Sequence, residues 1–260
     1  MKPIAHLEAA EAKALQGLLF DLDDTLLTHG KLTEAAFSAL FRLQESGLRL
    51  FCVTGRPISW GKLLVGQWPI EAAVCETGPL STRLKDGRVV EQDTLSPSQR
   101  EHNRVRLRTL VDEMHQRFPT LADASDATDR VSDYTFDIAE TKQISPALLE
   151  DACLFATGCG ARTNRSSIHL HVTFDTHDKA SGTLNLLNRE FGFDPTHARK
   201  LFAYIGDSEN DAACFAAFNT SIGVDNLRGT HTLLPAYKTQ AARGAGFAEA
   251  AEVLVELRRS

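Results

Sequence analysis

Short apolar strands alternate with amphipathic helices along much of this chain, and this alternation most constrains its fold. Near the N-terminus we expect strands at 18–20, 48–53 and 72–75 and a helix at 33–46. Thr33 supplies a helix N-cap and Gly47 a helix stop. Later in the chain we expect helices at 181–191 and 211–218 and strands at 201–205 and 221–224. Such alternation predicts parallel strands with helices packed on both faces of the sheet.

The pattern changes in the middle of the chain. We expect a hairpin at 82–90, a helix that begins at Ser96-Pro97, a strand at 131–138, a helix that begins at Ser145-Pro146 and a strand at 167–174. The sequence therefore predicts an α/β protein, with a Rossmann-like parallel-sheet core formed by 1–80 and 178–260. An α+β cap domain formed by 81–177 is inserted into this core.

Composition excludes several classes of protein. The chain has 260 residues, of which 43% are hydrophobic, enough for a sizeable core. Its net charge of −6 does not supply the positive field that nucleic-acid binding needs. Five dispersed cysteines fit a reducing compartment, and no run approaches the roughly 18 apolar residues of a membrane span. We expect a cytoplasmic protein with no nucleic-acid, membrane or obligate protein partner.

Four polar clusters lie where predicted strands end or helices begin. They are Asp21–Thr25, Thr54–Arg56, Lys179 and Gly206–Asp211. Ligands of open α/β sheets bind beyond the carboxyl ends of the strands, so these clusters should meet. Phosphoryl transfer needs a nucleophile, an acid for the leaving oxygen, a cation and donors to the phosphate oxygens. Mg²⁺ prefers one or two carboxylates with waters and phosphate oxygens, and the aspartates can provide them.

In this order the clusters resemble the motifs of the haloacid dehalogenase-like phosphatases. The resemblance implies that Asp21 is the nucleophile, that Asp23 is the general acid and later the base, and that Thr54 and Lys179 bind the phosphoryl group. It implies a Mg²⁺ ion held by residues of the first and fourth motifs, and further residues that contact substrate. The implied metal-site residues are Asp21, Asp23 (through its carbonyl), Asp207 and Asp211; the implied substrate-binding residues of the core are Gly55, Arg56 and Asn210.

The position of the insert resembles the type C2 cap of the Cof-type and sucrose-phosphate-phosphatase-like members. Residues 74–78 resemble the segment through which those proteins enter the cap, although Thr77 stands where many have Asn. Asp24 stands where Gly is frequent, and Ala-Ser-Gly follows Lys179 where many relatives have Gly directly. These departures remove no catalytic group. The implied activity is hydrolysis of a small phosphorylated metabolite, a sugar phosphate by this resemblance.

Two predicted cap strands alternate between apolar and polar residues. His169 and His171 share the polar face of one strand, and Asp133 and Asp137 share that of the other. This face either meets water or roofs the active site; in the second case the histidines are substrate-binding residues. Two alternatives to a phosphatase also stay open at this point: a phosphomutase with the same site, and a sugar-phosphate-binding protein without turnover.

Overall fold

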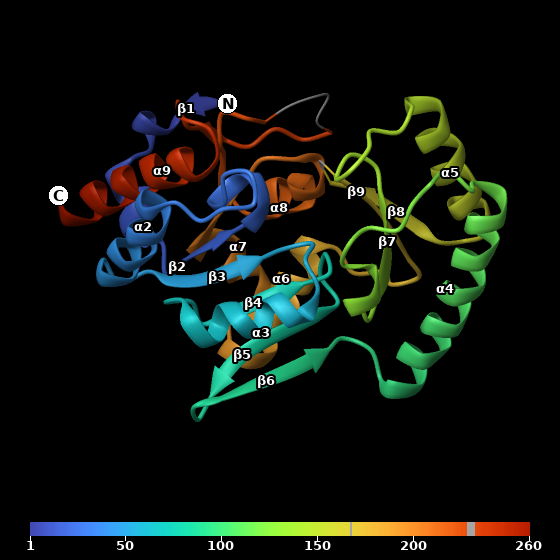
Figure 1. Ribbon diagram of the computed structural model, residues 1–260. Coiled ribbons are helices and arrows are strands. Elements are labelled where there is room, and N and C mark those ends of the chain that lie inside the picture. Colours follow the sequence, from blue (N-terminus) through green and yellow to red (C-terminus); the bar gives the residue numbers. More distant parts are fainter. Residues whose placement is uncertain (167, 228–231) are drawn as a thin grey trace.

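The computed structural model describes residues 1–166, 168–227 and 232–260, which form a larger and a smaller lobe (Figure 1). Within this part of the chain the larger lobe has a nine-stranded sheet. Its parallel part has the order β1 (Lys2–Pro3), β12 (Tyr237–Lys238), β11 (Thr220–Gly223), β10 (Phe202–Gly206), β2 (Gly17–Phe20), β3 (Arg49–Val53) and β4 (Ala72–Cys75). The antiparallel hairpin of β5 (Leu80–Lys85) and β6 (Arg88–Asp93) extends the β4 edge.

Helices cover both faces of this sheet, because successive strand residues point to opposite sides. Leu18 and Phe20 of β2 belong to one hydrophobic core, whereas Leu19 between them belongs to the other. The first core includes residues of α1 (Ala9–Ala14), α2 (Glu34–Glu45), α3 (Ile58–Gln67) and α9 (Arg243–Arg259). The second includes residues of α6 (Lys179–Phe191), α7 (Pro195–Leu201) and α8 (Ala212–Ala217). Single helical turns lie at Ile4–His6, Leu22–Leu26, Ala127–Asp129 and Glu209–Asp211. The predicted α/β architecture is confirmed.

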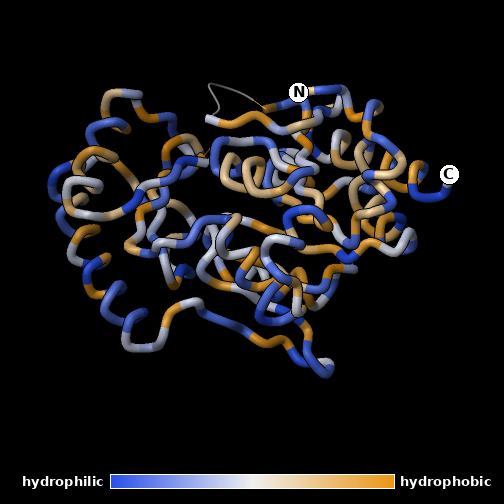
Figure 2. Tube along the Cα trace, turned by 180° about the vertical axis from the view of Figure 1, so that it is seen from behind, coloured by the Kyte–Doolittle hydropathy of each residue, from blue (hydrophilic) through white to orange (hydrophobic). Residues whose placement is uncertain are grey.

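The smaller lobe is a three-stranded antiparallel sheet with two helices on its outer face (Figure 1). Its elements are α4 (Pro97–Arg117), β7 (Asp133–Asp137), α5 (Pro146–Gly158), β8 (Arg162–Arg165) and β9 (His169–Thr173), with the strand order β7-β9-β8. The apolar strand residues pack on α4 and α5 in a separate core, so the polar strand face turns toward the larger lobe. Seen from behind, hydrophobic segments run through the interior of both lobes, and α4 is mostly hydrophilic (Figure 2).

Several predicted element ends are confirmed by their caps. Thr33 caps α2, Ser145 caps α5, and Ser96 with Gln99 forms a capping box at the start of α4. The predicted strand at 167–174 is observed as His169–Thr173, and its first predicted residue lies outside the described ones. In the described ranges, no helix is long and apolar enough to cross a membrane.

The predicted hairpin does not pair with the strands of the insert in the described residues. Residues of β5 pair with β4, from Cys75 opposite Leu80 to Ala72 opposite Arg83, and thus belong to the large sheet. The hairpin follows the polar end of β4 directly, and only the alternation of its residues was visible in the sequence. We therefore propose that the cap begins near residue 94, not at 81, and ends near 177.

Candidate active site

The first polar cluster places two aspartates in different surroundings. Asp21 follows β2 directly, and its backbone N–H still donates to the carbonyl of Ile205 in the neighbouring strand, at 2.9 Å. The chain then turns sharply through Leu22–Leu26, with Asp24 in the left-handed region at φ 55°. As a result the Asp21 side chain is 6% exposed and lies on the floor of the site, while that of Asp23 is 39% exposed.

Lys179 binds the Asp21 carboxylate from the opposite side of the floor. It is the first residue of α6, whose N-terminus is fixed by a capping box from Asp178. Its fully buried Nζ donates to Oδ1 of Asp21 at 2.7 Å, of Asn210 at 2.8 Å and of Asp211 at 2.7 Å. Burial alone would lower the pKa of Lys179, but the two carboxylates outweigh it and raise the pKa. The lysine therefore stays charged.

Asp211 is saturated with hydrogen bonds. Its Oδ1 accepts from Lys179 and from the hydroxyl of Tyr204 at 2.5 Å. Its Oδ2 accepts from the backbone N–H groups of Asp207 at 2.9 Å and Ser208 at 3.1 Å. A carboxylate has about four lone-pair sites, and these four bonds occupy them. Asp211 thus fixes both the lysine and the loop that carries Asp207.

Asp207 is held by one donor on each carboxylate oxygen. Thr25 donates its hydroxyl to Oδ1 at 3.1 Å, and Asn226 donates its amide to Oδ2 at 3.0 Å. One lone-pair site on each oxygen stays available. The Asn226 amide also donates to the carbonyl of Asp24, so this residue joins the Asp207 loop to the first motif.

The carboxylates of Asp21, Asp207 and Asp211 carry more negative charge than Lys179 compensates. One oxygen from each of the three lies within 4.8 Å of the others. Burial raises the pKa of Asp21 to about 7 and, together with repulsion from Asp21 and Asp211, that of Asp207 to about 9. A divalent cation would offset this excess, and hard oxygen ligands suit Mg²⁺. The donor set therefore fits the predicted metal, with Asp21 and Asp207 offering free lone pairs.

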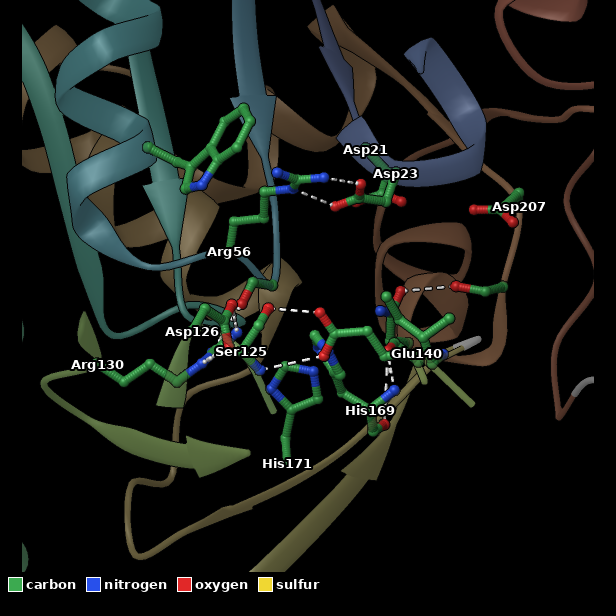
Figure 3. A pocket seen from close by; sticks show the side chains of 16 residues that line it. Asp21, Asp23, Arg56, Ser125, Asp126, Arg130, Glu140, His169, His171 and Asp207 are labelled. Carbon is green, nitrogen blue, oxygen red and sulfur yellow. Dashed lines mark hydrogen bonds and ion pairs between the residues drawn. The ribbon is translucent and has the colours of Figure 1, made fainter. Parts of the chain in front are cut away.

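Asp23 and Arg56 contact each other in the wall of a cavity of about 250 Å³ between the lobes (Figure 3). Arg56 binds the Asp23 carboxylate through two hydrogen bonds, Nε to Oδ2 at 2.8 Å and Nη2 to Oδ1 at 2.6 Å. The guanidinium carbon of Arg56 also lies 3.8 Å from the centre of the Trp60 ring. Of the predicted core residues, Asp21, Asp23, Gly55, Arg56, Asp207 and Asn210 line this cavity.

Thr54 and Gly55 lie at the end of β3. Thr54 is fully buried, does not line the cavity, and accepts a hydrogen bond from the backbone N–H of Arg56 at 3.1 Å. Its contact with the phosphoryl group stays a prediction. Gly55 contacts the cap: its carbonyl accepts from Nη1 of Arg130 at 3.0 Å, and a Cβ here would lie 3.4 Å from His171.

The polar face of the cap sheet forms the roof of the cavity and does not meet bulk water. His169 and His171 are buried and line the cavity. Nε2 of His169 contacts Glu140 at 3.0 Å, and Nδ1 of His171 contacts Asp133 at 2.8 Å. Asp137 lies opposite His169 in the strand pairing but does not line the cavity, and it accepts from the backbone N–H groups of Glu140 and Thr141. These two N–H groups belong to the short loop that follows β7, and they donate hydrogen bonds to the Asp137 carboxylate.

The structure adds cap residues that the sequence did not single out. They are Ser125, Asp126, Arg130, Glu140, Ser166 and Ile168. Asp126 belongs to an acidic stretch that resembles a solvated loop. Its carboxylate nevertheless accepts two hydrogen bonds from Arg130, from Nε to Oδ1 at 3.0 Å and from Nη2 to Oδ2 at 2.7 Å. A lone arginine or glutamate in a loop carries no sequence signal, because only its tertiary partners distinguish it from a surface residue.

Glu76 ties the cap to the core where the chain leaves β4. Its carboxylate accepts from the backbone N–H groups of Val131 at 3.0 Å and Ser132 at 2.7 Å, and from the Ser132 hydroxyl at 2.7 Å. Gly78 follows at φ 135°, where an added Cβ would lie 2.3 Å from the carbonyl oxygen of Asp178. Only glycine fits, because the turn between β4 and β5 passes against the backbone at the N-terminus of α6 here.

The comparisons agree with this geometry. Residues 18–104 match the family model of haloacid dehalogenase-like hydrolases. A search of curated proteins finds no match. A solved Thermoplasma acidophilum structure is similar at 17% identity and TM-score 0.74, covering 94% of this chain and 99% of its own.

Two further structures have named activities. The Synechocystis sucrose-phosphatase, solved with sucrose and phosphate, matches at 18% identity and TM-score 0.62 over 92% of this chain and 98% of its own. The C-terminal domain of the C. albicans trehalose-6-phosphate phosphatase matches at 12% identity and TM-score 0.66, over 95% of each chain. The chain thus has the fold of these solved structures, inserted cap included, and its residues 18–104 are similar to the haloacid dehalogenase-like hydrolases. The predicted resemblance to that family is confirmed.

Proposed function

We propose that this protein is a Mg²⁺-dependent phosphomonoesterase that forms an aspartyl-phosphate on Asp21. The observation that carries the proposal is the floor of the site. There the buried Lys179 holds Asp21 in place, and Asp207 lies close enough to share a cation with it. A binding protein would not need a desolvated carboxylate with a free oxygen at the end of the central strand.

The chain's own residues account for both half-reactions. An Asp21 oxygen attacks phosphorus while the bond to the leaving oxygen breaks, and Asp23 gives its proton to that oxygen. Asp23 then takes a proton from the water that attacks the aspartyl-phosphate, which releases phosphate and restores Asp21. Mg²⁺, bound by Asp21 and Asp207 with the Asp23 carbonyl, would neutralise phosphate charge. Asp211 acts through Lys179 and the Asp207 loop, since its own lone pairs are occupied.

Arg56 has a defined part in this scheme. Its two hydrogen bonds engage both oxygens of the Asp23 carboxylate. A phosphoryl group entering the cavity competes for the same guanidinium, because arginine binds phosphate oxygens in the same forked geometry. Substrate binding would thus release the Asp23 carboxyl group from Arg56, so that it can approach the leaving oxygen.

The substrate class follows from the roof. Sucrose-phosphatase and trehalose-6-phosphate phosphatase are among the structural neighbours, and the polar roof of this cap suits a hydroxylated leaving group. We propose a small sugar phosphate as substrate.

The test is release of free phosphate from p-nitrophenyl phosphate with and without Mg²⁺. We expect turnover with Mg²⁺, loss after EDTA treatment, and recovery when Mg²⁺ is added back. Ca²⁺ should inhibit, because its looser coordination sphere displaces the attacking carboxylate. Full activity in metal-free buffer would contradict the mechanism, and a mutase or a binding protein would release no free phosphate.

A further inference from the structure

The two ends of the cavity differ in the groups that they offer a substrate. The core end holds the groups that we assign to the phosphoryl group, and the cap end must receive the leaving group (Figure 3). The cap end contains two carboxylates, Asp126 and Glu140, and one cation, Arg130. What these three groups can bind decides which leaving groups fit, and the inference below rests on the proposed function.

Arg130 is not available to a second anion. Its guanidinium is 1% exposed and binds Asp126 on one side and Asp133 on the other, with Nη1 2.9 Å from Oδ1 of Asp133. The same Nη1 donates to the carbonyl of Gly55. At the core end, Arg56 is bound by Asp23 in the same way. Among the described residues lining the cavity, both arginines therefore have carboxylate partners.

His171 presents an acceptor to the cavity. Its Nδ1 lies 2.8 Å from the carboxylate of Asp133, which can only accept a hydrogen bond, so Nδ1 carries the proton. Burial lowers the pKa of His171, although Asp133 opposes this, and the ring stays neutral. Nε2 is then unprotonated and accepts hydrogen bonds.

Both cap carboxylates keep acceptor capacity. Glu140 accepts from the backbone N–H and hydroxyl of Ser125 and from His169. Asp126 accepts two bonds from Arg130 and one from Thr135. Three bonds to each leave about one lone-pair site of four on each carboxylate. The cap end thus offers several acceptors and a net negative charge, which suits hydroxyl donors and repels a carboxylate or second phosphate.

We propose that the leaving group is a neutral polyhydroxylated group, and that Asp126 and Glu140 are the specificity-determining residues that reject substrates with a second anionic group. A site built this way discriminates strongly, because an anion would face carboxylates and leave acceptors without donors.

The experiment compares substrates that differ only by a hydroxymethyl or a carboxylate group. The pairs are glucose 1-phosphate with glucuronic acid 1-phosphate, and glycerol 3-phosphate with 3-phosphoglycerate. We expect kcat/KM to favour the neutral member of each pair at least tenfold, and p-nitrophenyl phosphate serves as the reference. Equal or better turnover of the anionic members, or no turnover of either neutral member while p-nitrophenyl phosphate is hydrolysed, would overturn the inference. Failure to hydrolyse all of them, p-nitrophenyl phosphate included, would instead contradict the proposed function.

Two variants locate the discrimination. Glu140→Gln and Asp126→Asn keep the side-chain shape and remove one negative charge each; the second also leaves Arg130 with one fewer ionised partner. Each should reduce the neutral-to-anionic preference several-fold, chiefly by raising kcat/KM for the anionic member. Glu101→Gln on the outer face of α4, where the side chain is 58% exposed, is the matched control and should leave the preference unchanged. An unchanged preference in both cavity variants would overturn their assignment.

Discussion

The floor and the roof of the cavity differ in how their charged side chains are paired. On the floor, buried carboxylates surround one lysine and leave an excess of negative charge that a metal ion and a phosphoryl group can share. On the roof, Arg130 forms ion pairs with Asp126 and Asp133, and these two carboxylates neutralise its charge within the protein. The floor is thus suited to bind a metal ion and a phosphoryl group, whereas the roof presents hydrogen-bond acceptors. Reaction chemistry and substrate choice therefore depend on different elements of the fold.

Replacing the proposed acid tests the floor most strongly. Asp23→Asn should lower kcat for glycerol 3-phosphate by roughly 10²–10⁴-fold, the usual size of general acid–base catalysis, because an alkoxide needs a proton to leave. p-Nitrophenyl phosphate should lose less, since its leaving group departs without one. Steady-state kinetics on both substrates measures the difference. Asp86→Asn, at the exposed hairpin turn with φ 51°, is the control. Equal losses on both substrates would remove Asp23 from the role of acid.

Breaking the roof should affect stability more than chemistry. Asp133→Asn leaves Arg130 and His171 without their shared partner, and such a loss costs about 3 kcal/mol of unfolding free energy. Burial opposes ionisation of Asp133, but Arg130 and His171 outweigh it and hold its pKa at about 2. A lowered pKa contributes stability above the ordinary value of 3.8 that is lost as pH falls toward about 2.

Urea unfolding at several pH values checks this assignment. The difference between wild type and Asp133→Asn should be largest near neutral pH and should shrink as pH falls below about 4. The control is Asp129→Asn, which alters an exposed aspartate in the helical turn that precedes β7. A difference independent of pH would mean that Asp133 acts through packing and not through its charge.

The smallest expected effect concerns Asn226, which orients Asp207 without belonging to the proposed metal ligands. Asn226→Ala should raise the Mg²⁺ concentration for half-maximal activity about tenfold, the lower range for lost outer-shell partners. Activity measured across a Mg²⁺ titration tests this, with the exposed Asn219→Ala as control. A fall in kcat at an unchanged Mg²⁺ requirement would contradict the positioning role.

The same division explains what the sequence could predict. The floor was predictable because its residues follow strands in a fixed order, and parallel strands bring their carboxyl ends to one edge of the sheet. For the roof, the sequence predicted only that His169 and His171 share one face of a strand, because their alternation places them there. Their hydrogen-bond partners Glu140 and Asp133 depend on tertiary packing. Arg130 and Asp126 lie in a loop without periodicity.

Several fold features were not anticipated, and α3 (Ile58–Gln67) and β8 (Arg162–Arg165) are among the elements that were not predicted. The hairpin β5–β6 was assigned to the cap, whereas β5 pairs with β4 across the short connection 76–79 and extends the large sheet. Helix α9 was not predicted, although Phe247, Ala250, Ala251 and Leu254 recur at helical spacing and are fully buried.

The most direct test of the central claim is to trap the phosphorylated enzyme. The protein is quenched in acid during turnover of p-nitrophenyl phosphate with Mg²⁺, digested, and examined by mass spectrometry. The account predicts a phosphoryl group on the peptide that contains Asp21, located on that side chain. It also predicts that Asp21→Asn carries none and turns over roughly 10⁵-fold more slowly, as expected when a catalytic nucleophile is lost. A phosphoryl group on another residue, or turnover by Asp21→Asn near the wild-type rate, would contradict it.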